Sequence, residues 1–379
     1  MAEAFYQNFK LGILGGGQLG RMLIQSGIDL NISFSILDPD PEAPCKSLAE
    51  FTTGKLTDFE TVMSFGLSCD LITIEIENVN TKALRELMKL GKKVFPQPDV
   101  IELIQDKRTQ KEFYVAHNIP TAEFILTQNK EDVIQHKSFL PAVNKLGKEG
   151  YDGRGVQILR SEKDLDKAFD APGLLEKLID FEKEISVIVA RNERGEICSY
   201  PAAEMIFHPT QNLVEYLFAP ADISEAIARS ADEIARKVAD KIQIVGILAV
   251  EMFVTKQGKI LVNEIAPRPH NSGHQTIEAN VTSQYEQHLR AIHNLPFGDT
   301  SILLPSAMVN LLGEDGYAGS AVYQGLEKVL AVEGVHVHLY GKKKTKPFRK
   351  MGHVTIVDAD VKSLQKKANF VKENLKVIA

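Results

Sequence analysis

Two glutamates on neighbouring predicted strands carry the clearest chemical signal in the sequence. Glu251 lies in the apolar run 247–254, and Glu264 follows a second apolar run, 259–262. A two-residue turn at Gln257-Gly258 would place the two carboxylates directly opposite each other on one face of a hairpin. Facing carboxylates repel each other unless a cation lies between them, and Mg²⁺ prefers oxygen ligands. The sequence therefore predicts a magnesium site that serves phosphate chemistry.

The residues around and after Glu264 strengthen this interpretation. Positions 263–274 read Asn-Glu-Ile-Ala-Pro-Arg-Pro-His-Asn-Ser-Gly-His, a dense polar run stiffened by two prolines. Arg268 lies four residues after Glu264 and shares its face if the strand continues that far. The alternative is a solvated hairpin with two exposed glutamates, which would leave the polar run without a role.

A glycine-rich stretch from Gly147 to Gly155 separates two predicted strands and is too flexible for the interior of an element. We interpret it as a flap whose backbone donors bind phosphate, with Lys145 directing a cation to the same place. A disordered surface hairpin is the alternative. Residues 176–179 could present backbone groups to a base edge, and Glu184 could accept hydrogen bonds from ribose hydroxyls.

The first glycine cluster, Gly15 to Gly20, matches the pattern G-x-G-x-x-G, and Asp38 lies about where a ribose-binding acid belongs. Taken alone, it supports an NAD-dependent oxidoreductase. Glycines at such a turn also let backbone N–H groups and a helix N-terminus approach a smaller phosphorylated or polar ligand, such as a nucleotide monophosphate. A tight turn without a ligand is the third interpretation.

The elements that must position these residues alternate between strands and helices in the first hundred residues. Strands are expected at 11–14, 33–38, 71–74 and 94–95, and helices at 21–30 and 81–90. Such alternation predicts a parallel sheet with helices on both faces, and ligands bind at the carboxyl ends of its strands. The glycine cluster and Asp38 fall at that edge.

The rest of the chain is more mixed. A helix is expected at about 100–118, after a proline-rich boundary, and a helix at 225–241 carries an apolar stripe at helical spacing. Strands are expected at 122–126, 142–145, 156–160, 174–178 and 184–190. From about residue 294 the pattern changes to β-rich, and strands at 335–340 and 354–357 enclose the strongly basic loop 341–350.

Composition limits the function classes. The 379 residues predict two or three domains, and the net charge of −6 argues against a general nucleic-acid binder. Cys45, Cys69 and Cys198 lack metal-ligand spacing, which predicts a reducing compartment without disulfides. The sequence contains no apolar run long enough to span a membrane, and the first ten residues do not resemble a signal peptide. We therefore expect a cytoplasmic protein.

Several of these motifs together carry a family resemblance. The chain resembles the ATP-grasp fold and, within it, the 5-(carboxyamino)imidazole ribonucleotide synthetases, which use ATP and bicarbonate in purine biosynthesis. The resemblance covers essentially the whole chain. The motif at 263–274 is highly specific, the Tyr-Asp-Gly flap is fairly specific, and the N-terminal glycines are weak. The motifs that carry it are Gly15–Leu19, Glu75–Val79, Tyr151–Gly155, Asn263–His274 and Arg349–His353.

The resemblance implies an α/β protein (α+β overall) with three domains. These are a Rossmann-like parallel-sheet domain at 1–98, an ATP-grasp domain at 99–293 with a lid at about 119–180 and a glycine-rich flap, and a small β-rich domain at 294–379. It also implies a homodimer with ATP and Mg²⁺, and bicarbonate and aminoimidazole ribonucleotide as its other substrates.

The resemblance also assigns residues to roles. ATP would be held by Arg108, Lys145, Gly150, Tyr151, Asp152, Gly153, Arg154, Gly155, Val156, Glu176, Lys177, Leu178, Ile179, Glu184, His208, Asn263 and Glu264. Mg²⁺ would be held by Glu251 and Glu264. Bicarbonate and the intermediate would be held by Tyr151, Asp152, Arg154, Arg268, His270 and Asn271. The ribonucleotide would be held by Gln18, Glu77, Lys342, Arg349 and Lys350, the last three at its phosphate.

The chain departs from the family pattern at four positions. Glu149 stands in the flap where paired glycines are usual, and Asn144 stands in the preceding strand where an apolar residue is usual. Lys346 replaces an arginine and Phe348 a glycine in the basic loop. Lysine holds a phosphate only as a point charge, so the phosphate assignment is the weakest.

Three rival functions remain open at this stage. One is another ATP-grasp ligase, for example a formate-dependent ribonucleotide formyltransferase. The second is the NAD-dependent oxidoreductase, which leaves the glutamate pair and the flap without a role. The third is a protein that kept the pocket but lost turnover.

Overall fold

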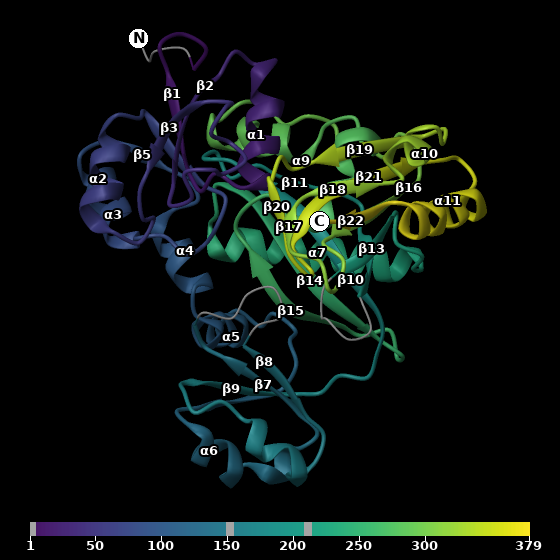
Figure 1. Cartoon of the computed structure of the whole chain (residues 1–379). Coiled ribbons are helices and arrows are strands. Elements are labelled where there is room, and N and C mark those ends of the chain that lie inside the picture. Colours follow the sequence, from purple (N-terminus) through teal and green to yellow (C-terminus); the bar gives the residue numbers. More distant parts are fainter. Residues whose placement is uncertain (1–4, 149–154, 208–213) are drawn as a thin grey trace.

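The computed structural model describes residues 5–148, 155–207 and 214–379. Three sheets dominate the fold: a five-stranded sheet at the N-terminal end, a four-stranded sheet, and a central nine-stranded sheet. The four-stranded sheet projects from one end of the molecule, away from the other two (Figure 1). Within the described residues, no helix is long and apolar enough to cross a membrane.

The N-terminal sheet is entirely parallel, with the order β3-β2-β1-β4-β5, as the alternating pattern predicts. Its strands are β1 (Lys10–Leu14), β2 (Ser33–Asp38), β3 (Glu50–Thr53), β4 (Leu71–Ile74) and β5 (Lys93–Val94). Helix α1 (Gln18–Ile28) packs on one face, and α2 (Phe59–Leu67) and α3 (Thr81–Lys89) pack on the other. The carboxyl ends of β1 and β4 therefore meet at one edge.

The single helix expected at 100–118 is wrong, because two helices occupy this region. They are α4 (Pro98–Ile104) and α5 (Lys107–Ala116). Asp106 interrupts them in an extended conformation, and its side chain accepts a hydrogen bond from the backbone N–H of Arg108 at 3.0 Å. An aspartate that caps a helix in this way starts a new helix rather than continuing the old one.

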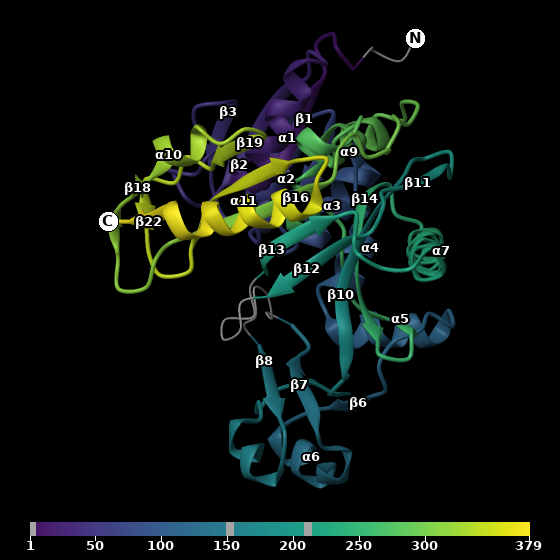
Figure 2. The same cartoon turned by 90° about the vertical axis from the view of Figure 1, so that its right-hand side faces the viewer.

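The projecting sheet has the order β6-β9-β7-β8 and forms a small body with its own core. It contains β6 (Phe124–Thr127), β7 (Ala142–Leu146), β8 (Val156–Leu159) and β9 (Gly173–Lys177), with α6 (Lys130–Gln135) packed against it. Figure 2 shows this body below the main part of the molecule. We call it the lid.

The central sheet is antiparallel and extends from β15 to β19 in the order β15-β14-β10-β12-β13-β16-β21-β19, with β11 paired to β10. Its strands are β10 (Phe181–Arg191), β11 (Ile197–Ser199), β12 (Ala203–Phe207), β13 (Val214–Ala219), β14 (Gly246–Thr255), β15 (Ile260–Ala266), β16 (Ser306–Leu312), β19 (Val335–Leu339) and β21 (Lys350–Val357). The β-rich C-terminal segment thus continues the sheet that carries the glutamate pair.

The remaining elements cover this sheet and its edges. Helix α7 (Glu225–Ile242) packs on β10, and α11 (Val361–Asn374) packs on β16 and β21. The others are α8 (Thr276–Ala279), α9 (Gln284–Ile292), α10 (Leu326–Leu330), β17 (Gly319–Ser320), β18 (Val322–Gln324), β20 (Lys344–Thr345) and β22 (Lys376–Ile378).

Candidate functional site

Glu251 on β14 and Glu264 on β15 lie directly opposite each other, as the sequence predicts. The expected two-residue turn, however, is wrong. Residues 256–258 form a three-residue loop in which Gly258 has a φ of 74°, and this loop alone would place Asn263 opposite Glu251. A bulge at Asn263 shifts the register by one residue and restores the carboxylate pair.

Two lysines and a third glutamate surround this pair. Lys107, at the start of α5, makes an ion pair with Glu264, and Lys145 on β7 donates to Oδ1 of Asn263 at 2.9 Å. The positive charge of Lys107, assisted by Lys145, lowers the pKa of Glu264 to about 2. Burial and the charge of Glu264 raise the pKa of Glu184, on β10, to about 8.

The electrostatics of Glu251 fit a divalent cation. Burial, followed by repulsion from Glu264 and Glu184, raises its pKa well above the ordinary value. The raised pKa means that the neighbouring positive charges do not compensate for burial and for the repulsion between the carboxylates. Mg²⁺ commonly binds one or two carboxylates and completes its shell with phosphate oxygens. Glu251 and Glu264 fit that pattern, and the described residues offer no cluster of three or more His, Cys, Asp or Glu side chains as another metal site.

Lys107, which is not among the predicted site residues, enters the site, whereas its neighbour Arg108 pairs with Asp106. The Arg108 guanidinium donates to both carboxylate oxygens of Asp106, at 3.0 and 2.7 Å, and lies beside Gly147 at the base of the glycine-rich stretch. Burial disfavours the charged form of Lys107 most, but Glu264 outweighs this effect and raises the pKa of the lysine. Asp106, as the N-cap, indicates that α5 begins at Lys107, and this was the sequence signal that could have identified Lys107.

Glu176 anchors the lid strand β9 through a buried network of ion pairs. Its carboxylate lies 2.9 Å from Nζ of Lys145 and 3.2 Å from Nζ of Lys111. Burial alone would raise the pKa of Glu176, but the two lysines outweigh burial and lower it, while burial lowers the pKa of Lys111 to about 8. The network joins α5 to the lid at the base of the lid.

The segment after Glu176 is predicted to contact a nucleotide base. Two of its backbone N–H groups instead form hydrogen bonds within the lid. The N–H groups of Lys177 and Leu178 donate to the carbonyls of Glu123 and Pro141, at 2.8 and 3.2 Å. These two donors are therefore used within the lid, and a base contact through them is not supported. Ile179 follows at the end of this run.

Arg268 does not share the strand face of Glu264, because β15 ends at Ala266. Its Nε lies 2.9 Å from Oε1 of Glu77. The structure thus pairs a residue predicted to hold bicarbonate with one predicted to hold the ribonucleotide, and it places both between the N-terminal sheet and the central sheet.

His270 and Asn271 lie in the turn that follows Arg268. Nε2 of His270 lies 3.4 Å from Oε1 of Glu251, so the structure brings this imidazole to the carboxylate pair. Neither polar atom of the buried Asn271 amide has a hydrogen-bond partner among the described residues. A buried amide in this state is suited to binding a ligand.

The glycine cluster Gly15–Gly20 does not form the phosphate cradle that the sequence suggested. The N–H groups of Gly17 and Gly20 each donate to the Glu75 carboxylate at 2.6 Å, and that of Gly16 donates to Asp38 at 2.6 Å. The carboxylate of Glu75, the residue after β4, thus occupies the anion position at the start of α1. The N–H groups of Gly16, Gly17 and Gly20 are therefore already bonded within the protein, and a phosphate contact through them is not supported.

The basic loop converges on α1 and on the carboxylate pair. Nζ of Lys342 donates to Oε1 of Gln18 at 2.9 Å and to the carbonyl of Lys350 at 2.7 Å. The charge of Lys350 acts on Glu251, which places this lysine toward the proposed metal site. Arg349 is partly exposed, and one of its guanidinium nitrogens donates to the carbonyl of Lys344 at 2.7 Å.

One of the four departures from the family pattern, Asn144, has a physical explanation in the structure. Asn144 is buried, yet both ends of its amide are satisfied: Nδ2 donates to the carbonyl of Leu174 at 3.2 Å, and Oδ1 accepts from the N–H of Phe169 at 2.8 Å. Phe348 has a φ of 61°, a left-handed conformation that glycine adopts without strain. Nothing in the structure explains Lys346.

Part of the predicted site lies outside the described residues. This applies to Glu149, Gly150, Tyr151, Asp152, Gly153, Arg154 and His208. Gly155 and Val156, at the end of the predicted flap, are described. The carbonyl of Gly155 accepts from the N–H of Leu146 at 2.9 Å, which closes the β7–β8 hairpin beside Lys145.

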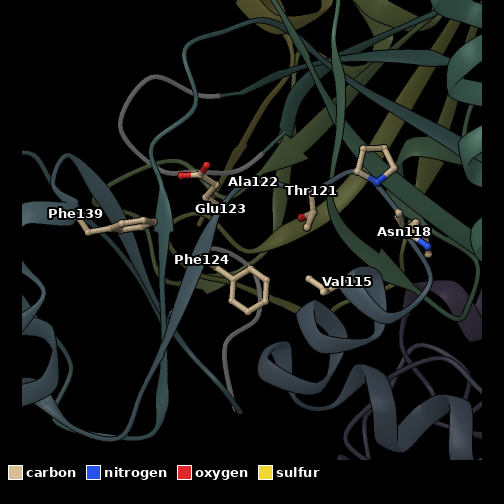
Figure 3. Close-up of a pocket in the computed structure, with 9 residues that line it drawn as sticks. Val115, Asn118, Thr121, Ala122, Glu123, Phe124 and Phe139 are labelled. Carbon is tan, nitrogen blue, oxygen red and sulfur yellow. The ribbon is translucent and has the colours of Figure 1, made fainter.

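A separate groove of about 610 Å³ lies where the lid joins α5. Figure 3 shows Phe124 and Phe139 from the lid and Val115 from α5 along its walls. None of the predicted site residues lines it. This groove is therefore distinct from the site built around Glu251.

Three known protein domains match successive parts of the chain. A ribonucleotide synthetase preATP-grasp domain matches residues 9–105, an ATP-grasp domain matches 112–285, and a phosphoribosylaminoimidazole carboxylase C-terminal domain matches 306–367. Together they account for all three sheets.

Relatives and solved structures match over nearly the whole chain. An N5-carboxyaminoimidazole ribonucleotide synthase from Bacillus subtilis is 36% identical and covers 94% of this chain and 93% of its own length. The crystal structure of the corresponding synthetase from Thermotoga maritima has a TM-score of 0.89 at 45% identity, covering 98% of this chain and 99% of that one. An Aspergillus clavatus synthase, solved with ADP and 5-aminoimidazole ribonucleotide, has a TM-score of 0.88 at 33% identity, covering 97% and 98%.

Some relatives are longer than this chain. The phosphoribosylaminoimidazole carboxylases of Ogataea methanolica, Candida glabrata and Vigna aconitifolia are 37–39% identical, and the chain spans only 65–69% of their length.

Proposed function

The chain belongs to the N5-carboxyaminoimidazole ribonucleotide synthase family of ATP-grasp enzymes, and on this premise we propose that it is an ATP-dependent carbon–nitrogen ligase of purine biosynthesis. Its reaction carboxylates 5-aminoimidazole ribonucleotide at the exocyclic amine, with ATP as the energy source. The products are N5-carboxyaminoimidazole ribonucleotide, ADP and phosphate.

ATP binds between the lid and the central sheet in this proposal. Lys145, fixed by Glu176 and Asn263, supplies a cation at the phosphates, and Lys107 supplies a second one from α5. Phosphoryl transfer depends mainly on alignment and on neutralising charge, and both lysines serve these needs. The buried ion pairs at Glu176 keep the lid strand in place relative to α5.

Glu251 and Glu264 would hold Mg²⁺, which would neutralise charge on the ATP phosphates. Bicarbonate attacks the γ-phosphate, which yields carboxyphosphate and ADP. The amine of the ribonucleotide then takes the carboxyl group from carboxyphosphate, or from carbon dioxide released by it, and phosphate leaves. His270 and Asn271 bind the bicarbonate-derived anion, and Arg268 is held beside this pocket by Glu77.

The remaining assignments are parts of the same proposal. The ribonucleotide lies between α1 and the basic loop, near Gln18, Glu77 and Lys342, with its phosphate at Arg349 and Lys350. The domain boundaries near residues 98 and 293, the homodimer and the cytoplasmic location stay predictions.

One observation carries the proposal: the facing pair Glu251 and Glu264 lies within reach of Lys107, Lys145 and His270. ADP release, measured with ATP and Mg²⁺, tests it directly. We expect ADP release to require bicarbonate together with aminoimidazole ribonucleotide. Release that requires formate instead would establish the formate-dependent ligase, and no release under any combination would refute the proposed turnover.

A further inference from the structure

His270 is held in one orientation by contacts on both sides of its ring. On one side, Nδ1 accepts from the backbone N–H of Ser272 at 3.3 Å and lies 2.8 Å from the Ser272 hydroxyl. On the other side, Nε2 lies 3.4 Å from Oε1 of Glu251. Because a backbone N–H can only donate, Nδ1 is an acceptor, and the ring proton of the neutral imidazole is on Nε2.

The Ser272 hydroxyl is itself supported by a second buried hydroxyl. Oγ of Ser272 lies 2.7 Å from Oγ of Ser186, and both side chains are almost completely buried, at 1% and 2% exposure. Since the Ser272 hydroxyl donates to Nδ1, it accepts from the Ser186 hydroxyl. Ser186 lies on β10 directly opposite Glu251 on β14, so the contacts form a closed ring through two strands.

The backbone of His270 is fixed independently of these hydroxyls. Its N–H donates to Oε1 of Gln284 at 2.9 Å, and its carbonyl accepts from Nε2 of Gln284 at 2.7 Å. Gln284 is completely buried. Loss of the Ser272 hydroxyl would therefore remove the shorter of the two contacts to Nδ1 and weaken the preference for one tautomer, without releasing the turn.

We propose that Ser272 is a positioning residue that, supported by Ser186, fixes His270 as the Nε2–H tautomer. In this form the neutral imidazole is a hydrogen-bond donor toward Glu251 and toward an anion bound beside it. The other tautomer would turn an unprotonated nitrogen toward the carboxylate and lose that donor. The role in turnover rests on the function proposed above, whereas the tautomer itself does not.

The tautomer can be measured without turnover. In protein labelled with ¹⁵N-histidine, nitrogen NMR distinguishes protonated from unprotonated ring nitrogens, and His270→Asn identifies the His270 signals. We expect the wild-type ring to carry its proton on Nε2. Ser272→Ala keeps the backbone N–H at 3.3 Å but loses the shorter hydroxyl contact at 2.8 Å, so we expect a measurable fraction of the Nδ1–H tautomer beside the Nε2–H form. Ser186→Ala should have a smaller effect because Ser272 keeps its hydroxyl. A wild-type proton on Nδ1, or an unchanged tautomer in Ser272→Ala, would overturn the proposal.

Kinetics test the consequence for the reaction. Ser272→Ala should lower kcat about tenfold, while the KM for ATP changes by less than about twofold. Ser306→Ala is the matched control, because Ser306 is equally buried and its hydroxyl has no hydrogen-bond partner among the described residues. This control should change neither the tautomer nor kcat. If Ser272→Ala shows a mixture of tautomers but an unchanged kcat, the proposed role of the tautomer in turnover is refuted. If ADP release requires formate instead of bicarbonate, only the proposed function is refuted.

Discussion

Glu251 and Glu264 face each other only because Asn263 bulges out of the pairing between β14 and β15. The bulge has a second effect, since it also directs the Asn263 amide to Lys145. The bulge at Asn263 thus places the two carboxylates opposite each other and brings Asn263 into contact with Lys145 of the lid. Bulges often re-aim side chains next to active sites in this way.

Glu264→Ala should remove turnover while the fold survives. The glutamate side chain is partly exposed, and it provides one of the two proposed metal ligands and pairs with Lys107. We expect kcat/KM for ATP to fall at least about 100-fold, in line with the loss of a charge-stabilising group. ADP release measures the activity, and thermal unfolding checks the fold.

The control for this variant is Glu182→Ala, which removes an exposed carboxylate from β10 outside the site. It should leave activity unchanged. Near-normal activity in Glu264→Ala at saturating Mg²⁺ would end the metal proposal.

Lys107→Met and Arg108→Met form a matched pair that tests which basic residue acts on ATP. Lys107 pairs with Glu264, so its loss should lower kcat/KM for ATP about 100-fold. The Arg108 side chain is partly exposed and pairs with Asp106 rather than with the carboxylate pair. Its loss should lower kcat/KM less than about fivefold. Steady-state kinetics at varied ATP separate the two, and the reverse order of effects would favour Arg108 as the ATP ligand.

The sequence predicts elements best where a local pattern decides them. The strand at 71–74, Leu-Ile-Thr-Ile, is buried on both faces, and the structure confirms it with the predicted bounds. The helix at 100–118 failed because its apolar spacing continues across Asp106, whereas the cap that divides it depends on one side-chain hydrogen bond.

The sequence predicted which acidic residues form the site, but it did not predict the backbone geometry and the hydrogen bonds that position them. The pairing of Glu251 with Glu264 was expected from an incorrect turn, and the bulge that produces it has no local sequence signal. The sequence left three interpretations of the glycine cluster open, and it did not indicate that Glu75, 55 to 58 residues away, accepts hydrogen bonds from the N–H groups of Gly17 and Gly20. Such long-range contacts are set by the sheet and cannot be inferred from spacing.

His288 should make the protein less stable in acid. It is fully buried, Nδ1 accepts from the N–H of Ile247 at 3.2 Å, and Nε2 lies 2.9 Å from the Thr73 hydroxyl. Burial lowers its pKa to about 3. Because the unfolded state then binds more protons, stability falls as the pH drops from about 6.5 toward 3. At pH 5 the loss is about 2 kcal/mol, from 1.5 pH units at about 1.36 kcal/mol each.

His288→Asn tests this linkage. The Asn amide oxygen can still accept from Ile247 but cannot titrate, so the variant should lose about 1 kcal/mol at pH 7.5 through the missing Thr73 contact. Between pH 7.5 and 5, its unfolding free energy should decline about 2 kcal/mol less than that of the wild type. Urea denaturation at both pH values measures this difference, and parallel declines would rule out the buried neutral histidine as the cause.

Arg349→Ala should weaken binding of the ribonucleotide much more than binding of ATP. Arg349 lies in the basic loop beside Lys350, and a charge-assisted hydrogen bond to a phosphate contributes about 1.5–3 kcal/mol. The KM for aminoimidazole ribonucleotide should therefore rise about 10- to 100-fold, with a change below about twofold in the KM for ATP. Lys343→Ala is the control from the same loop, because Lys343 is largely exposed and paired with Glu42. It should change neither constant by more than about twofold, and equal effects of Arg349→Ala on both substrates would contradict the role given to the basic loop.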